Sequence, residues 1–117
     1  MSRANSLQTE QLTDSAYYIL LALLSPKHGY AIMKYIEELT TGEVKIGPAT
    51  LYTLIKKMQK SGYILLNEDD DDRRKTYQIT QSGELLITAE IERRLRMAAH
   101  GNAAIQTAKE GSSDEEG

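Results

Sequence analysis

A helix with well-marked ends lies near the middle of the sequence and restricts what can surround it. Gly47-Pro48 predicts its start, because proline at the first helical position has a suitable φ and its missing N–H costs nothing there. Lys60-Ser61-Gly62 predicts its end, because glycine readily adopts the left-handed conformation that stops a helix. Its apolar face recurs at helical spacing and consists of Leu51, Leu54, Ile55 and Met58.

Two further helices are predicted before this one. The first begins between Glu10 and Asp14, is apolar almost all round, and ends at Pro26, since the residue before a proline avoids the α region. The second follows Gly29 and runs to about Thr40, with Gly42 as its stop. A helix that is apolar all round must be covered all round, so we expect the first helix to meet both its own domain and a partner subunit.

Two β segments follow the middle helix and predict a hairpin. They cover residues 63–67 and 74–79 and are rich in Ile, Leu and Tyr. The segment between them, 68–73, is too polar to be buried and forms a charged tip, in which the run Asp69–Asp72 has no functional explanation.

A long helix is predicted from Thr80, which caps it, to about Ala108. Ile91, Ala98 and Ile105 are spaced by seven, and Leu95 and Asn102 fall between them, which is typical of a narrow helix-pairing seam. The alternative is an amphipathic helix packed on its own domain. We prefer pairing, because the helix outruns the small domain available to cover it.

The predicted fold class is therefore mostly α with a small β-hairpin: a winged helix-turn-helix followed by a long C-terminal dimerisation helix. The predicted domains are a DNA-binding domain over residues 10–80, the dimerisation helix over 81–108 and a disordered acidic tail over 109–117.

Composition excludes several classes of function. There is no cysteine, the two histidines stand far apart, and no catalytic or phosphate-loop motif occurs, so we expect neither an enzyme nor a metal or other cofactor. No run approaches the roughly 20 apolar residues that span a bilayer, and no signal-peptide pattern opens the sequence, so we expect a cytoplasmic protein. The net charge of −3 arises from the tail after Ala108, and the remainder is balanced.

The basic residues outside the tail are clustered on the middle helix and beside the hairpin tip. In a helix-turn-helix protein the second helix of the motif enters the major groove, and a wing lies along the duplex. The residues predicted to contact DNA are Pro48, Ala49, Thr50, Tyr52, Thr53, Lys56, Lys57, Arg73, Arg74 and Lys75. Alternatives stay open for Tyr52, which could pack against the wing, and for Thr50, Lys57 and Lys60, which could be ordinary surface.

Several short motifs together resemble the PadR family of transcriptional repressors, over about residues 12–100. The motifs are His28-Gly29-Tyr30, Gly42-Glu43, Ala49-Thr50-Leu51-Tyr52-Thr53 with Lys57, Lys60-Ser61-Gly62-Tyr63-Ile64, Asp72-Arg73-Arg74-Lys75-Thr76-Tyr77, and Ile79-Thr80 with Gly83. The single last helix resembles the family's smaller subclass.

The resemblance implies a two-fold dimer, built by the last helix together with the first, on a palindromic operator in double-stranded DNA. The expected dimer residues are Tyr17, Leu20, Ile87, Ile91, Leu95, Ala98 and Ile105. The resemblance also implies release by a small aromatic, phenolic or drug-like ligand. Multidrug-sensing members stack the ligand on a tryptophan of the last helix, but this sequence has no Trp or Phe and carries Arg94 at the matching position. The expected ligand residues are Tyr17, Tyr18, Ile91 and Arg94.

The predicted function is a homodimeric, sequence-specific DNA-binding repressor. The alternative is a winged-helix protein-interaction module that does not bind DNA, which the acidic pI and the Asp69–Asp72 run favour. The basic clusters on the middle helix and beside the hairpin tip argue against that alternative.

Overall fold

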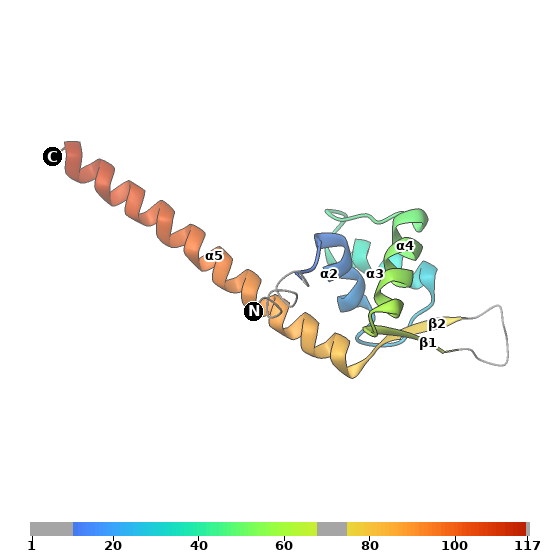
Figure 1. Cartoon of the computed structure of the whole chain (residues 1–117). Coiled ribbons are helices and arrows are strands. Elements are labelled where there is room, and N and C mark those ends of the chain that lie inside the picture. Colours follow the sequence, from blue (N-terminus) through green and yellow to red (C-terminus); the bar gives the residue numbers. More distant parts are fainter. Residues whose placement is uncertain (1–10, 68–74, 117) are drawn as a thin grey trace. The chain divides into compact units, whose positions relative to one another are not determined.

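The computed structural model describes residues 11–67 and 75–116. The chain divides into two compact units, residues 1–87 and 88–117. The elements are α2 (Asp14–Ala22), α3 (Gly29–Leu39), α4 (Pro48–Lys60), β1 (Ile64–Asn67), β2 (Thr76–Ile79) and α5 (Gln81–Glu116) (Figure 1). This is the predicted fold class, a mostly helical winged helix-turn-helix with a long C-terminal helix.

The start of α2 and both ends of α3 and α4 lie close to where the sequence signals predicted them, whereas α2 ends at Ala22, before the expected stop at Pro26. Thr13 caps α2 by accepting a hydrogen bond from the Ala16 N–H, and Pro48 is the first residue of α4. α3 ends before Gly42, and α4 ends before Gly62, both of which have positive φ. After α4, the Tyr63 N–H donates to the Met58 carbonyl and the Gly62 N–H to the Gln59 carbonyl, which satisfies two carbonyls of the last turn.

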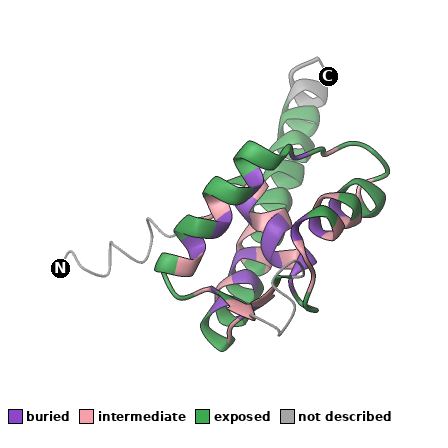
Figure 2. Cartoon of the chain, turned by 90° about the vertical axis from the view of Figure 1, so that its right-hand side faces the viewer, coloured by how far each residue is buried: buried purple, intermediate pink, exposed green. Residues whose placement is uncertain are grey.

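The core of the first unit is aliphatic. Figure 2 shows buried residues on the sides of the helices that face inward and exposed residues on their outer sides. The largest fully buried side chains are Ile19, Leu20, Leu23, Ile32, Ile36, Leu51, Ile55 and Ile87. Four helices contribute to this set, and the inner face of α4 is held by its packing against α2, α3 and β1.

The wing is an antiparallel hairpin of β1 and β2, and one residue outside the hairpin also pairs with β2. Ile64 pairs with Ile79 at its base, and Asn67 pairs with Thr76 at the end of the described ladder. Lys27 also pairs with Tyr77, through two backbone hydrogen bonds of 2.8 and 3.0 Å. The loop between α2 and α3 is thereby joined to the wing, a connection that the sequence analysis did not predict.

Lys27 is a structural cation. Its Nζ donates to the Ala22 carbonyl at 2.7 Å and to the Ser25 hydroxyl at 2.9 Å, and it lies 4.5 Å from the centre of the Tyr35 ring. Partial burial lowers the pKa of Lys27 below its ordinary value. A positive charge at the C-terminal end of α2 complements the exposed carbonyls of that helix.

The end of the last helix differs from the expectation. The sequence predicts a helix end near Ala108 and a disordered tail from residue 109, whereas α5 continues to Glu116. Residues 103–110 are mostly good helix formers, and the Gln106 amide donates to the Glu110 carboxylate at 3.2 Å. A glycine such as Gly111 weakens a helix by about 1 kcal/mol relative to alanine but does not by itself end it.

The first unit also extends further than the predicted boundary at residue 80. Gly83 and Ile87 are buried, so the first turns of α5 belong to the same core as α2, α3 and α4. A Cβ atom on Gly83 would lie 2.4 Å from the Tyr63 carbonyl oxygen and 2.6 Å from the Ile79 side chain. Only glycine fits where α5 crosses the backbone after α4.

We predict that Gly83→Ala lowers the free energy of unfolding by about 1–3 kcal/mol, because overpacking against a backbone atom forces the helix away. Gly101 is the matched control, since it lies in the same helix and a Cβ atom there would have no neighbour within 4 Å. Gly101→Ala should stabilise the chain by about 0.5–1 kcal/mol. Urea denaturation followed by circular dichroism measures both, and equal effects of the two substitutions would contradict the packing argument.

Candidate nucleic-acid interface

The helix-turn-helix consists of α3 and α4, and the turn between them is held by Thr40. Its hydroxyl donates to the Ile36 carbonyl at 2.9 Å and accepts from the Val44 N–H at 3.0 Å. α4 buries Leu51, Ile55 and Met58 on one side. All the residues of α4 predicted to contact DNA are exposed: Pro48, Ala49, Thr50, Tyr52, Thr53, Lys56 and Lys57.

The charged side chains of α4 and of the two wing strands are all positive among the described residues. α4, β1 and β2 contain Lys56, Lys57 and Lys60 and no Asp or Glu, and exposed Lys75 directly precedes β2. The carboxylates of the helix-turn-helix lie instead on α3 and in the turn after it, at Glu37, Glu38 and Glu43. In this overall acidic chain, α4 therefore carries only positive charge. Arg73, Arg74 and the Asp69–Asp72 run lie outside the described residues.

Tyr52 lies against the start of α3. A Cβ atom on Gly29 would come 1.9 Å from the Tyr52 hydroxyl, so the end of the ring covers the first turn of that helix. The pKa of Tyr77 in the wing is raised, first by burial and then by the proximity of Tyr52. Tyr52 is thus close to both α3 and the wing, although its side chain stays exposed. Gly29, which has no side chain, leaves the space that the Tyr52 ring occupies.

A shallow open hollow of about 460 Å³ joins the beginnings of α2 and α4. Four hydroxyl-bearing side chains line it, Thr13 and Ser15 from the start of α2 and Thr50 and Thr53 from α4. Hydroxyls and backbone N–H groups are common donors to phosphate oxygens. Thr13 and Ser15 are not among the residues predicted to contact DNA, because nothing in the local sequence of residues 13–15 indicates that they lie beside α4.

Two of the seven residues expected at a dimer interface are not on the surface. Leu20 is fully buried and Ile87 nearly so, and both lie within the first unit of a single chain. Tyr17 is half-buried. In the second unit Ile91 is half-buried, while Leu95 is 66% exposed and Ile105 59% exposed, and Ala98 is exposed as well.

The residues expected to bind a ligand have structural partners. Tyr17 and Tyr18, in the first unit, stack edge to face with ring centres 5.3 Å apart. In the second unit, Arg94 Nε lies 2.9 Å from a carboxylate oxygen of Glu90, which Arg93 also binds through two nitrogens. Glu90 is only 4% exposed, and its charge is matched by two guanidinium groups.

Two other kinds of feature do not occur in the described part of the chain. No group of His, Asp and Glu there could hold a metal ion. No helix within residues 11–67 and 75–116 is long and apolar enough to cross a membrane.

Comparison with known proteins identifies the family. A family model for the PadR-like family of transcriptional regulators matches residues 19–89, which is more than half of the chain. The chain therefore belongs to this family, whose members regulate transcription and are not enzymes. The predictions of family and of a non-enzymatic role are thus confirmed. No curated protein matches the sequence.

Solved structures show the same fold. A transcriptional regulator from Clostridium thermocellum is 25% identical with a TM-score of 0.66, and the match covers 77% of this chain and 90% of that one. A PadR-like transcription factor from Bacteroides fragilis is 20% identical with a TM-score of 0.65, over 88% of this chain and 98% of that one. A PadR family regulator from Eggerthella lenta is 22% identical with a TM-score of 0.61, over 88% and 87%.

The interaction of Glu90 with Arg93 and Arg94 predicts a specific dependence of stability on pH. Hydrogen bonds from Arg93 and, less strongly, from Arg94 hold the pKa of Glu90 below its ordinary value of 4.5, against the opposing effect of burial. Its contribution to stability is therefore present above pH 4.5 and is lost as the pH falls below that value. Thermal melts of wild type and Glu90→Gln should differ most above about pH 5.

The difference between the two melting temperatures should then narrow as the pH falls further below 4.5 and the wild-type carboxylate becomes protonated. Glu92→Gln is the control, because Glu92 is an exposed carboxylate on the same helix. A gap between wild type and Glu90→Gln that stays constant from pH 3 to pH 7 would contradict the assignment.

Proposed function

We propose that this chain is a homodimeric, sequence-specific DNA-binding repressor that acts in the cytoplasm. It holds a palindromic operator through two copies of α4 and the wing, and it releases the operator when a small molecule binds. The observation that carries the proposal is the outer face of α4, which presents hydroxyls and lysines without a carboxylate on a helix whose inner face is fixed in the core.

Each exposed residue of α4 has a role in this proposal. The N-terminal residues of the second helix in such a motif contact base edges, so Thr50 and Thr53 read sequence. Lys56 and Lys57 lie about one turn further on and neutralise phosphates, and Lys75 does the same from the wing. Arg73 and Arg74 remain predicted contacts of the wing tip.

The second unit supports pairing through α5. Ile91, Leu95, Ala98, Asn102 and Ile105 follow a spacing of four and three residues, which keeps them on one face of the helix. Leu95 and Ile105 are exposed in the single chain, and an apolar stripe of this kind is stable when another helix covers it. A two-fold axis would place the same stripe of a second copy against it and would give two copies of α4 for two half-sites.

The pairing is tested by one substitution on the stripe and one beside it. Leu95→Asp should raise the dimer dissociation constant on the order of 100-fold or more, because a buried apolar anchor is worth about 2 kcal/mol or more and occurs twice. Met97→Asp is the matched control, since Met97 is also an exposed apolar residue of α5 (54%) but points off the stripe.

Light scattering during size-exclusion chromatography measures the mass of each variant as a function of concentration. The proposal expects a dimeric wild type and Met97→Asp and a monomeric Leu95→Asp that keeps its helical circular dichroism. A monomeric wild type, or equal masses for the two variants, would rule out pairing through this stripe.

DNA binding is tested by titrating the chain onto the DNA upstream of its own gene at several salt concentrations. Lys56→Ala should weaken binding to every sequence and reduce the slope of log affinity against log salt by about 1, because one phosphate contact is lost. Lys34→Ala is the control, since it removes the same charge from an α3 face shared with Glu37 and Glu38. An unchanged slope in Lys56→Ala would place the DNA elsewhere, and no complex at low salt would reject the proposal.

A further inference from the structure

The loop between α2 and α3 bonds to the edge of β2 that β1 leaves open. The Tyr77 N–H donates to the Lys27 carbonyl at 2.8 Å, and the Lys27 N–H donates to the Tyr77 carbonyl at 3.0 Å. Two residues further along β2, the Ile79 N–H donates to the Leu23 carbonyl at 3.1 Å. β2 is therefore bonded to β1 on one side and to the backbone of residues 23–27 on the other, so this loop joins the wing to the helix-turn-helix.

The side chain of Lys27 holds the loop that carries this pairing. Its Nζ donates to the carbonyl of Ala22, the last residue of α2, at 2.7 Å and to the Ser25 hydroxyl at 2.9 Å. It also lies 4.5 Å from the centre of the Tyr35 ring in α3. One ammonium group thus connects the end of α2, the loop and α3, and it makes these interactions within the chain.

The residues just after Lys27 also support α4. The Tyr52 hydroxyl lies 1.9 Å from where a Cβ atom on Gly29 would be, and Gly29 is only two residues after Lys27. Burial raises the pKa of Tyr77 most, and the proximity of Tyr52 raises it further, so Tyr52 is near the wing as well. Residues 27–29 therefore contact the wing at one end and α4 at the other.

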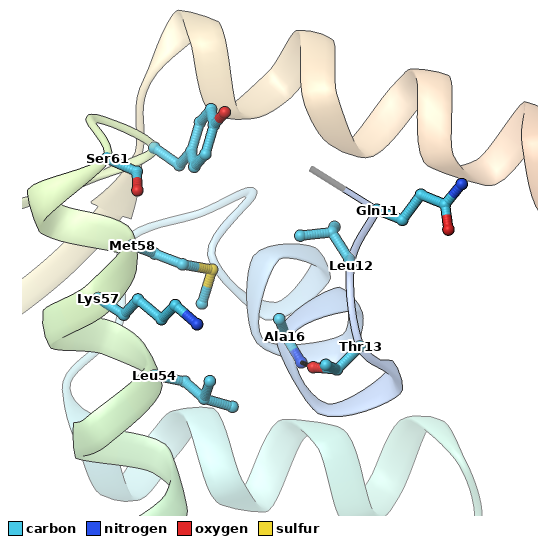
Figure 3. Close-up of a pocket in the computed structure, with 9 residues that line it drawn as sticks. Gln11, Leu12, Thr13, Ala16, Leu54, Lys57, Met58 and Ser61 are labelled. Atoms are coloured by element: carbon cyan, nitrogen blue, oxygen red, sulfur yellow. Dashed lines mark hydrogen bonds between the residues drawn. The ribbon is translucent and has the colours of Figure 1, made fainter. Parts of the chain in front are cut away.

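α4 is packed less completely on the side away from Tyr52. A cavity of about 130 Å³ lies there, between α4 and the start of α2 (Figure 3). In Figure 3 Leu54, Lys57 and Met58 extend from α4 into this space, and at 3.6 residues per turn they lie on the face away from Tyr52. Side chains that line a cavity have no protein atoms packed against that part of their surface. The position of α4 therefore depends strongly on its other side, where Tyr52 meets the start of α3.

We infer that Lys27 is a positioning residue for DNA binding, which holds the wing and α4 in the arrangement that lets both contact one duplex. This inference rests on the proposed function, in which α4 and the wing bind the same operator. Lys27 acts through the residues that it holds and makes no phosphate contact itself. A wing that is already held in the binding arrangement loses less conformational entropy when the complex forms, so the affinity for DNA is higher.

The anchoring role is tested first on the free protein, by amide hydrogen exchange measured by NMR. Lys27→Met keeps the apolar stem but removes the charge, so the Tyr77 amide, which bonds to the loop, should exchange about 5-fold faster. Successive N–H groups of a strand point to opposite edges, so the Gln78 amide faces β1 and should change by less than about 2-fold. Equal changes at Tyr77 and Gln78, or no change at Tyr77, would overturn the anchoring role.

Two milder variants accompany this test. Lys27→Arg keeps a cation for the Ala22 carbonyl and the Tyr35 ring and should restore the wild-type exchange of Tyr77. Ser25→Ala removes one acceptor of the ammonium group and should give a smaller acceleration in the same direction, which keeps the test decisive where Lys27→Met fails to fold.

The effect on DNA is tested by titration at several salt concentrations. Lys27→Met should weaken binding about 5-fold, while the slope of log affinity against log salt stays at the wild-type value because no phosphate contact is lost. Lys27→Arg should keep the wild-type affinity. Lys34→Met is the matched control, since it removes the charge of an exposed lysine on α3 and should leave the affinity unchanged. A slope reduced by about 1 in Lys27→Met would make Lys27 a phosphate contact and overturn the inference.

A double-mutant cycle separates a role through the wing from a general loss of stability. Lys75 is a proposed contact of the wing and Lys56 a proposed contact of α4. Lys75→Ala should weaken binding less in the Lys27→Met background than in wild type, because a poorly held wing gains less from its contact, whereas Lys56→Ala should have the same effect in both backgrounds. Additive effects of Lys75→Ala and Lys27→Met would reject the positioning role while DNA binding itself stands. A wild type that binds no DNA would instead contradict the proposed function, and the exchange of Tyr77 in the free protein would still identify the anchor.

Discussion

The arrangement of the first unit depends on the backbone just after α4. The Gly62 carbonyl accepts hydrogen bonds from the Thr80 hydroxyl at 2.6 Å and the Ser82 hydroxyl at 3.1 Å. The Tyr63 carbonyl accepts the Thr80 N–H and lies where any side chain on residue 83 would be. The end of α4, the start of the wing and the start of α5 are therefore joined at one point. A change in the direction of α5 at its first turn must move the end of α4 or break these bonds.

The residues at this junction illustrate which parts of the fold could be predicted from the sequence. The bounds of α4 follow from Gly47-Pro48 and from Gly62, because these residues act through their own backbone. Gly83 was recognised only as a residue near a helix start, and its packing against Tyr63 depends on residues twenty positions away. The pairing of Lys27 with Tyr77 was missed for the same reason. Leu20 and Ile87 were assigned to an interface because an apolar pattern does not say whether its cover is the same chain or another.

The candidate site was predictable to a similar degree. Helical periodicity alone separates the buried face of α4 from Thr50, Thr53 and Lys56, and the structure leaves these residues exposed. Periodicity could not place the Tyr52 hydroxyl against Gly29, nor bring Ser15 and Thr50 to the same hollow, since each pair of residues comes from different helices. The cavity beside Lys57 could not be predicted from the sequence either, because its walls come from two separate segments, residues 11–16 and 54–63.

The central claim is that two copies of this chain place two α4 helices on one operator. Footprinting first identifies the region of the operator that the protein protects. Native mass spectrometry of the protein bound to a short duplex of that region then tests the claim most directly, because it measures the mass of the complex. The account predicts two chains per duplex and a protected region with two related half-sites about one helical turn apart. One chain per duplex, or a protected region without repeated half-sites, would contradict it.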